Sequence, residues 1–171
     1  MADARCVDCF LKTYHMLFQK YGVGEMQQQK FLDYFHRVIV NQNFENSPII
    51  QRDLNIAFCD IIEIADPFAE EKEESNRVAL GLYRMWKEQV IDADNPFGMA
   101  LRLAIAGNIM DYGASNSFDI NGTVKRVLNA DFAIDHSAQL KERIAKAQRI
   151  LYLGDNAGEI VFDRLFIETF M

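Results

Sequence analysis

Apolar side chains recur three and four residues apart through most of this 171-residue chain. That spacing is typical of amphipathic helices that bury one face. Glycine, proline and short polar segments divide the pattern, so it predicts separate helices rather than one long helix. The predicted helical ranges are 10–21, 31–39, 50–65, 68–91, 97–110, 120–128 and 137–147. The range 97–110 is apolar almost all round, which predicts a helix buried at the centre of a bundle.

The last part of the chain has a different pattern. A short apolar run over 150–153 is followed by a turn of Gly, Asp and Asn residues, and then by helix-compatible sequence over 159–170. This order predicts a buried strand that leads through a tight loop into a helix. We therefore expect residues 1–147 to form a helical domain and residues 148–171 to begin a second, α/β domain.

Composition and charge argue against several classes of function. Half of the residues are apolar, which is enough for one substantial core, and the formal charge is −7 at pH 7. Proteins that bind the nucleic-acid backbone normally carry clustered Lys and Arg, so nucleic acid is not an expected partner. No stretch approaches the roughly 18 to 20 apolar residues of a membrane span, and the N-terminus lacks the features of a signal peptide. We expect a cytoplasmic protein that does not bind membranes.

The turn between the predicted strand and the last helix carries the strongest candidate chemistry. Asp155 and Asn156 place a carboxylate and an amide oxygen side by side, and hard cations such as Mg²⁺ and Mn²⁺ prefer oxygen ligands. Gly154 and Gly158 permit unusual backbone angles, and the start of the following helix offers N–H groups to an anion such as a phosphorylated substrate. The residues alone leave a second interpretation equally open, in which Asp-Asn-Ala-Gly is only turn chemistry with a helix cap.

Several motifs, in the same order along the chain, resemble those of the damage-control phosphatase family. These are metal-dependent phosphatases related to the acidic-residue-methyltransferase-like metal-binding domain. The signature is Gly154-Asp155-Asn156-Ala157-Gly158-Glu159-Ile160-Val161-Phe162-Asp163. The upstream matches are Asp66-Pro67-Phe68 with Lys72 and Asn76, then the segment 104–113, and Cys6-Val7-Asp8-Cys9, which resembles the prokaryotic branch.

The resemblance implies a helical domain packed on a Rossmann-like α/β domain, with the active site between them. It implies that Asp155 and Asn156 hold a divalent ion of Mg, Mn, Co or Ni, together with a further Asp from a later strand. That Asp and a downstream phosphate-binding Lys have no position in this sequence. We therefore expect a C-terminally truncated α/β domain, and an isolated chain that is inactive or needs a partner chain to complete its site.

Four further polar residues are candidates for the same site. Asn108 and Asp111 share one face at the end of an apolar helix, and the resemblance places them near the active-site cleft as substrate contacts. Local satisfaction of the helix end before Gly113 is the alternative. Glu159 is expected to shape the substrate side of the site from the first turn of the last helix, through orientation of the metal ligands, and favourable charge at a helix N-terminus is its alternative. Asp163 is expected to be structural.

Three cysteines form a second candidate site. Cys6 and Cys9 are spaced to chelate, and Cys59 could add a thiolate from the third predicted helix, so a Zn or Fe site is one interpretation. Packing in the bundle is the other.

These observations favour a metal-dependent phosphatase that hydrolyses small phosphorylated metabolites. Asp155 and Asn156 would be the catalytic metal ligands, with Asp155 preferred as ligand over nucleophile. The alternative is a noncatalytic helical interaction module, or a fragment that self-associates or binds a partner through an exposed half-domain.

Overall fold

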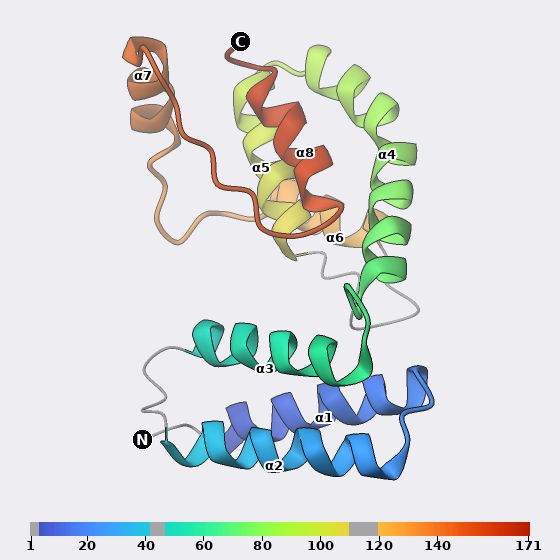
Figure 1. Cartoon of the computed structure of the whole chain (residues 1–171). Coiled ribbons are helices and arrows are strands. Elements are labelled where there is room, and N and C mark those ends of the chain that lie inside the picture. The colour runs from blue at the N-terminus through green and yellow to red at the C-terminus, as the bar shows by residue number, and fades with distance from the viewer. Residues whose placement is uncertain (1–3, 42–46, 110–119) are drawn as a thin grey trace. The chain divides into compact units, whose positions relative to one another are not determined.

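The computed structural model describes residues 4–41, 47–109 and 120–171. They form eight helices and, within those ranges, no strand (Figure 1). The helices are α1 (Ala4–Lys20), α2 (Glu25–Asn41), α3 (Ser47–Ile62), α4 (Ala69–Ile91), α5 (Pro96–Ile109), α6 (Ile120–Asn129), α7 (Ser137–Lys146) and α8 (Glu159–Ile167). The mainly helical class and each predicted helix are confirmed.

The chain divides into two compact units, Met1–Pro67 and Phe68–Met171. In the first unit, α1, α2 and α3 pack around a group of aromatic rings, as the three- and four-residue spacing requires. Tyr14 and Phe31 have ring centroids 4.5 Å apart, and Phe58 lies against both. The Tyr14 hydroxyl, which needs a partner because the ring is buried, donates to Asn55 Oδ1 at 2.7 Å.

The second unit contains α4 to α8, and its core lies where α8 packs on α5 and α4. Residues of α8 that face this core include Val161, Phe162, Leu165 and Phe166. Gly107 allows the close approach of α5 to α8, because a Cβ at that position would lie 3.0 Å from Phe162 Cβ. The all-round apolar helix of the sequence is therefore α5, and its burial is confirmed for Ala100, Leu103, Ala104 and Ala106.

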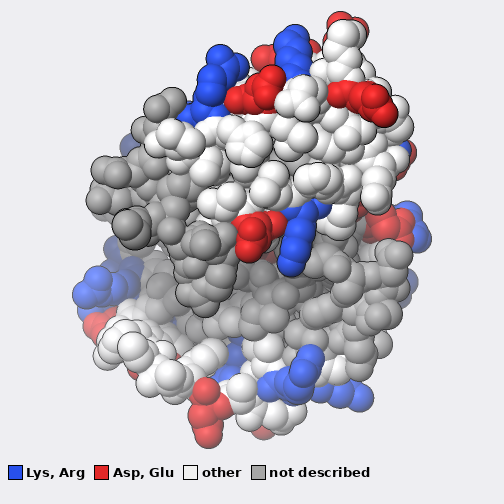
Figure 2. Space-filling model, turned by 90° about the horizontal axis from the view of Figure 1, so that it is seen from below, with Lys and Arg blue, Asp and Glu red and all other residues white. Residues whose placement is uncertain are grey.

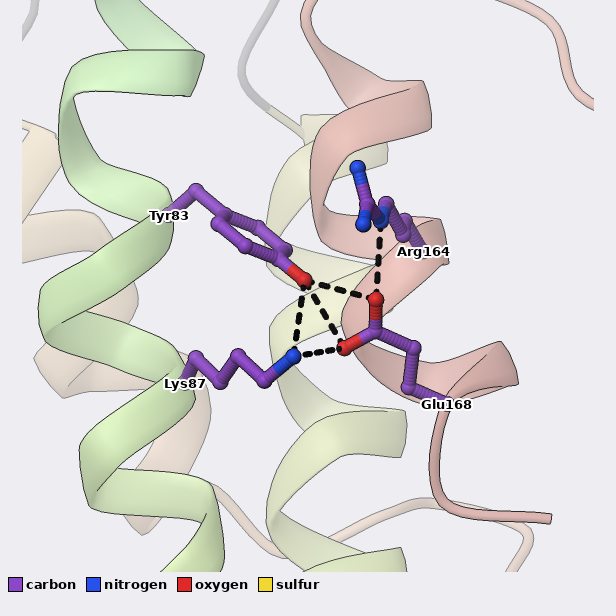
Figure 3. Close-up of polar contacts among 4 residues, drawn as sticks. All are labelled: Tyr83, Lys87, Arg164 and Glu168. Carbon is purple, nitrogen blue, oxygen red and sulfur yellow. Dashed lines mark hydrogen bonds and ion pairs between the residues drawn. The ribbon is translucent and has the colours of Figure 1, made fainter. Parts of the chain in front are cut away.

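A polar cluster fixes the C-terminal end of α8 to α4 (Figure 3). The Glu168 carboxylate accepts hydrogen bonds from the Tyr83 hydroxyl at 2.6 and 2.8 Å. It also accepts from Lys87 Nζ at 2.9 Å and from Arg164 Nε at 2.8 Å. These donors, Tyr83 first, lower the pKa of Glu168 to about 2.

The predicted strand over 150–153 is wrong for this chain, since those residues have no regular secondary structure. A strand exists only through hydrogen bonds to a neighbouring strand, and the described part of the chain contains none to pair with. Leu151 and Leu153 are accordingly 85% and 80% exposed rather than buried. The last helix also ends earlier than expected, at Ile167 instead of residue 170.

Acidic and basic side chains are interspersed among the described residues on the face shown in Figure 2, without a continuous basic field. Among the helices that the structure describes, none is both long and apolar enough to cross a membrane.

Candidate functional site

The segment from Gly154 to Gly158 forms a loop that ends at the first turn of α8. Gly158 caps the helix with φ 81° and ψ −40°, a backbone conformation that a side chain would strain. The unusual backbone angle expected of this glycine is thus present. Because one face of α8 is buried against α5 and α4, the loop that precedes it has a rigid support.

Glu159 folds back over the loop from the first turn of α8. Its side chain is buried, with the residue only 6% exposed. Glu159 Oε2 accepts the backbone N–H of Asn156 at 3.1 Å and its side-chain Nδ2 at 3.2 Å. Nδ2 also lies 3.3 Å from Asp155 Oδ2. Since carboxylates at neutral pH only accept hydrogen bonds, these contacts fix the Asn156 amide with its nitrogen toward them and its Oδ1 turned to the other side.

The donor set of the loop suits a hard cation. Asp155 and Asn156 are both exposed, and they offer a carboxylate and an oriented amide oxygen. They do not make a complete site, because the described residues contain no group of three or more His, Cys, Asp and Glu side chains placed to hold a metal. The two residues alone could therefore supply only part of a coordination shell, and their role as metal ligands stays a prediction.

Asn76 of α4 joins the loop to the helical core. The Gly158 N–H donates to Asn76 Oδ1 at 2.7 Å, a contact between residues 82 apart in the sequence. Asn76 follows the buried Ser75 and precedes the buried Ala79 on α4. The sequence motif contained Asn76, but nothing in the spacing of residues indicated that its partner is the loop glycine.

Asp163 lies one turn beyond Glu159 and is 2% exposed. Its Oδ1 accepts the Tyr152 hydroxyl at 2.7 Å, while its buried Oδ2 has no hydrogen-bond partner among the described residues. Burial raises the pKa of Asp163, and the nearby Glu159 carboxylate raises it further, against the opposite effect of the Tyr152 hydrogen bond. Burial, then the contact with Asp163, also raises the pKa of Tyr152. Asp163 thus ties residue 152, just before the loop, to α8.

Comparison with known proteins identifies the family. A profile of the damage-control phosphatase ARMT1-like domain matches residues 2–171. The chain belongs to this family. A damage-control phosphatase of Archaeoglobus fulgidus is 31% identical over 137 residues, which cover 76% of this chain and 47% of the relative. A damage-control phosphatase of Pyrococcus horikoshii is 36% identical over 105 residues, covering 60% of this chain and 35% of the relative.

The fold is that of a crystallised DUF89 family protein from Pyrococcus horikoshii, with a TM-score of 0.83 and 24% identity. That match covers 99% of this chain and 59% of the crystallised chain. The chain thus spans about half, or less, of the length of the curated damage-control phosphatases that it matches.

Asn108 and Asp111 are the other two residues expected at the site of this damage-control phosphatase family member, and only Asn108 lies among the described residues. Asn108 is exposed near the C-terminal end of α5, directly after the Gly107 contact with α8. Asp111 lies outside the described residues. A substrate role for either stays a prediction.

The three cysteines lie in the first unit, Cys6 and Cys9 on α1 and Cys59 on α3. None forms a disulfide, and they are not part of a described cluster of three potential ligands. Cys59 lies close enough to Tyr14 to raise its pKa, after the larger effect of burial. The thiolate metal site also stays a prediction.

Proposed function

We propose that the loop 154–158 provides two metal ligands of a damage-control phosphatase that hydrolyses small phosphorylated metabolites, such as sugar phosphates or damaged cofactor intermediates. The observation that carries the proposal is the pair of hydrogen bonds from Asn156 to Glu159, which holds an amide oxygen ready beside the exposed Asp155. The contact of Glu159 with the Asn156 backbone N–H is one that a helix cap makes. Its second contact, with the Asn156 side-chain amide, orients a side chain that a cap alone does not need.

In this proposal Asp155 and Asn156 hold the divalent ion and Glu159 orients Asn156. When bound, the ion would polarise the phosphoryl group and lower the pKa of an attacking water. Asn108, near the end of α5, and Asp111 would contact the substrate. The proposal names Mg, Mn, Co or Ni as the ion and a small phosphorylated metabolite as the substrate. The fold alone does not distinguish among these metals or substrates.

The proposal includes a second domain. The family resemblance implies that residues 148–171 begin a Rossmann-like α/β domain next to the helical domain of residues 1–147, and that a later strand supplies the third ligand. The greater length of the relatives supports this, and the exposed Leu151 and Leu153 are apolar side chains that a following domain would cover. A cytoplasmic location belongs to the same proposal.

Hydrolysis of p-nitrophenyl phosphate, with and without Mn²⁺, Co²⁺ or Ni²⁺, tests the function. In a form of the protein that includes the later strand and its Asp, we expect metal-stimulated hydrolysis that falls by at least about 100-fold in Asp155→Ala, since removing a ligand costs more than the roughly 10- to 100-fold of an outer contact. Asp131→Ala, which removes an exposed carboxylate outside the loop, is the matched control and should leave the rate unchanged. In that form, a wild-type protein without metal stimulation, or an Asp155→Ala variant as active as wild type, contradicts the proposal.

A noncatalytic interaction module is the second candidate, and the exposure of Leu151 and Leu153 favours it. It predicts a chain that is inactive with every metal and that self-associates or binds a partner through residues 150–153. A Zn or Fe site at Cys6, Cys9 and Cys59 is a separate proposal, which unchanged metal content in a Cys6→Ser, Cys9→Ser variant would eliminate.

A further inference from the structure

We propose that Asn76 is a positioning residue that sets the conformation of the 154–158 loop. It would act on the cation ligands through the backbone of Gly158, not by touching the cation or substrate. The inference rests on the proposed function only for its effect on metal binding, because the effect on the loop itself can be measured without any metal.

The first step is that the end of the loop needs an outside partner. Gly158 adopts a positive φ and begins α8, so its N–H points away from the helix ladder and has no carbonyl four residues before it within the helix. Asn76 Oδ1 accepts that N–H at 2.7 Å. A partly buried backbone N–H left without an acceptor would be costly, so this contact favours the observed conformation over one in which the loop rotates outward.

The second step is that the ligands depend on this conformation. Asn156 stands two residues before Gly158, and Glu159 stands one residue after it. Glu159 can reach both N–H groups of Asn156 only if the intervening turn at Gly158 keeps its shape. Asn76 therefore fixes Gly158, which lies between Asn156 and Glu159, and the contact of Glu159 with Asn156 orients the Asn156 amide.

The third step separates this role from simple docking of α8 on α4. The same two helices are joined at the opposite end of α8, where Tyr83 donates to Glu168 at 2.6 Å (Figure 3). Tyr83→Phe removes a hydrogen bond between the same helices far along α8 from the loop, and it is the matched control. Helix docking alone predicts equal effects of the two contacts, whereas positioning predicts that only Asn76 affects the loop.

The experiment uses the full chain in four forms: wild type, Asn76→Leu, Asn76→Asp and Tyr83→Phe. Leu has nearly the shape of Asn without an acceptor, whereas Asp keeps an oxygen for the Gly158 N–H. Amide hydrogen exchange at Gly158 is followed by NMR without metal, and Mn²⁺ affinity is measured by titration. Asn76→Leu should exchange the Gly158 amide about tenfold faster and bind Mn²⁺ about tenfold more weakly, the factor that corresponds to about 1.4 kcal/mol. Asn76→Asp should restore protection of the amide, and Tyr83→Phe should match wild type in both measurements.

Three results overturn the inference: an unchanged Gly158 exchange rate in Asn76→Leu, an unchanged Mn²⁺ affinity in a variant whose Gly158 is exposed, or equal losses in Tyr83→Phe. If Asn76→Leu does not fold, Asn76→Ala takes its place with the same criteria. If no form binds Mn²⁺, the proposed metal role fails, and the exchange rates alone decide whether Asn76 sets the loop.

Discussion

Replacing Gly107 by alanine tests the packing that seats α8. In an exposed helix interior, Gly to Ala stabilises by about 0.8 to 1.0 kcal/mol. At Gly107, however, the new Cβ would lie 3.0 Å from Phe162 Cβ and 3.3 Å from its Cγ and Cδ2. Phe162 Cβ is fixed by the α8 backbone and cannot rotate away, so α8 itself must move.

The magnitude follows from the two opposing effects. Overpacking a tight contact costs typically about 1 to 3 kcal/mol, which exceeds the gain in helix propensity over most of that range. Gly107→Ala should therefore destabilise the second unit by about 1 kcal/mol. Gly81→Ala is the matched control, because Gly81 lies in the interior of α4 and a Cβ added there would meet no atom within 4 Å. That variant should stabilise by about 0.8 to 1.0 kcal/mol.

Urea unfolding followed by tryptophan fluorescence measures both changes. Trp86 is the sole tryptophan of the chain and is buried in the core that contains Phe162, so its signal reports the second unit. With a urea dependence of about 2 kcal/mol per M, the two variants should differ by roughly 1 M in midpoint. If Gly107→Ala stabilises as much as Gly81→Ala does, the close contact between α5 and α8 is wrong.

Two pH dependences follow from the carboxyl groups of α8 and its C-cap. The pKa of Glu168 is lowered from 4.5 to about 2, so the stability that Glu168 contributes is complete above pH 4.5 and is lost as the pH falls toward 2. Acid unfolding followed by circular dichroism should therefore show a smaller loss of stability for Glu168→Gln than for wild type. The pKa of Asp163 is raised, so the folded state holds that proton more tightly than the unfolded chain and loses the resulting stability as the pH rises above about 4. Urea midpoints of Asp163→Asn should decline less than those of wild type over that rise, and equal slopes in the two proteins would contradict the burial of an ionisable Asp163.

The helices were predictable because each carries its own periodicity and its own boundaries. The start of α5 is an example, since Asn95 precedes Pro96 and its Oδ1 accepts the Gly98 N–H at 3.1 Å. The candidate loop was likewise recognisable, because glycines and adjacent Asp and Asn are local features. Glu159 contacts Asn156, and its role in orienting a metal ligand stays a prediction.

Local pattern could not reveal that residues 150–153 form no strand in the described chain, nor could it reveal the long-range contacts. An apolar run such as 150–153 has the composition of a strand, but pairing depends on a neighbour that these residues do not find in the described chain. The contacts of Asn76 with Gly158 and of Tyr152 with Asp163 join groups that lie on different elements. No periodicity encodes such pairs, because they arise only after α8 packs.

The hydrogen bond between Asn76 and Gly158 also bears on the order of folding. It closes 82 residues of chain, and contacts between such distant residues form late because the loss of chain entropy precedes their benefit. On the ribosome α4 is made long before α8, so the loop can reach its final shape only after α8 has emerged and docked. The conformation of Asp155 and Asn156 therefore depends on a step of folding that follows the docking of α8.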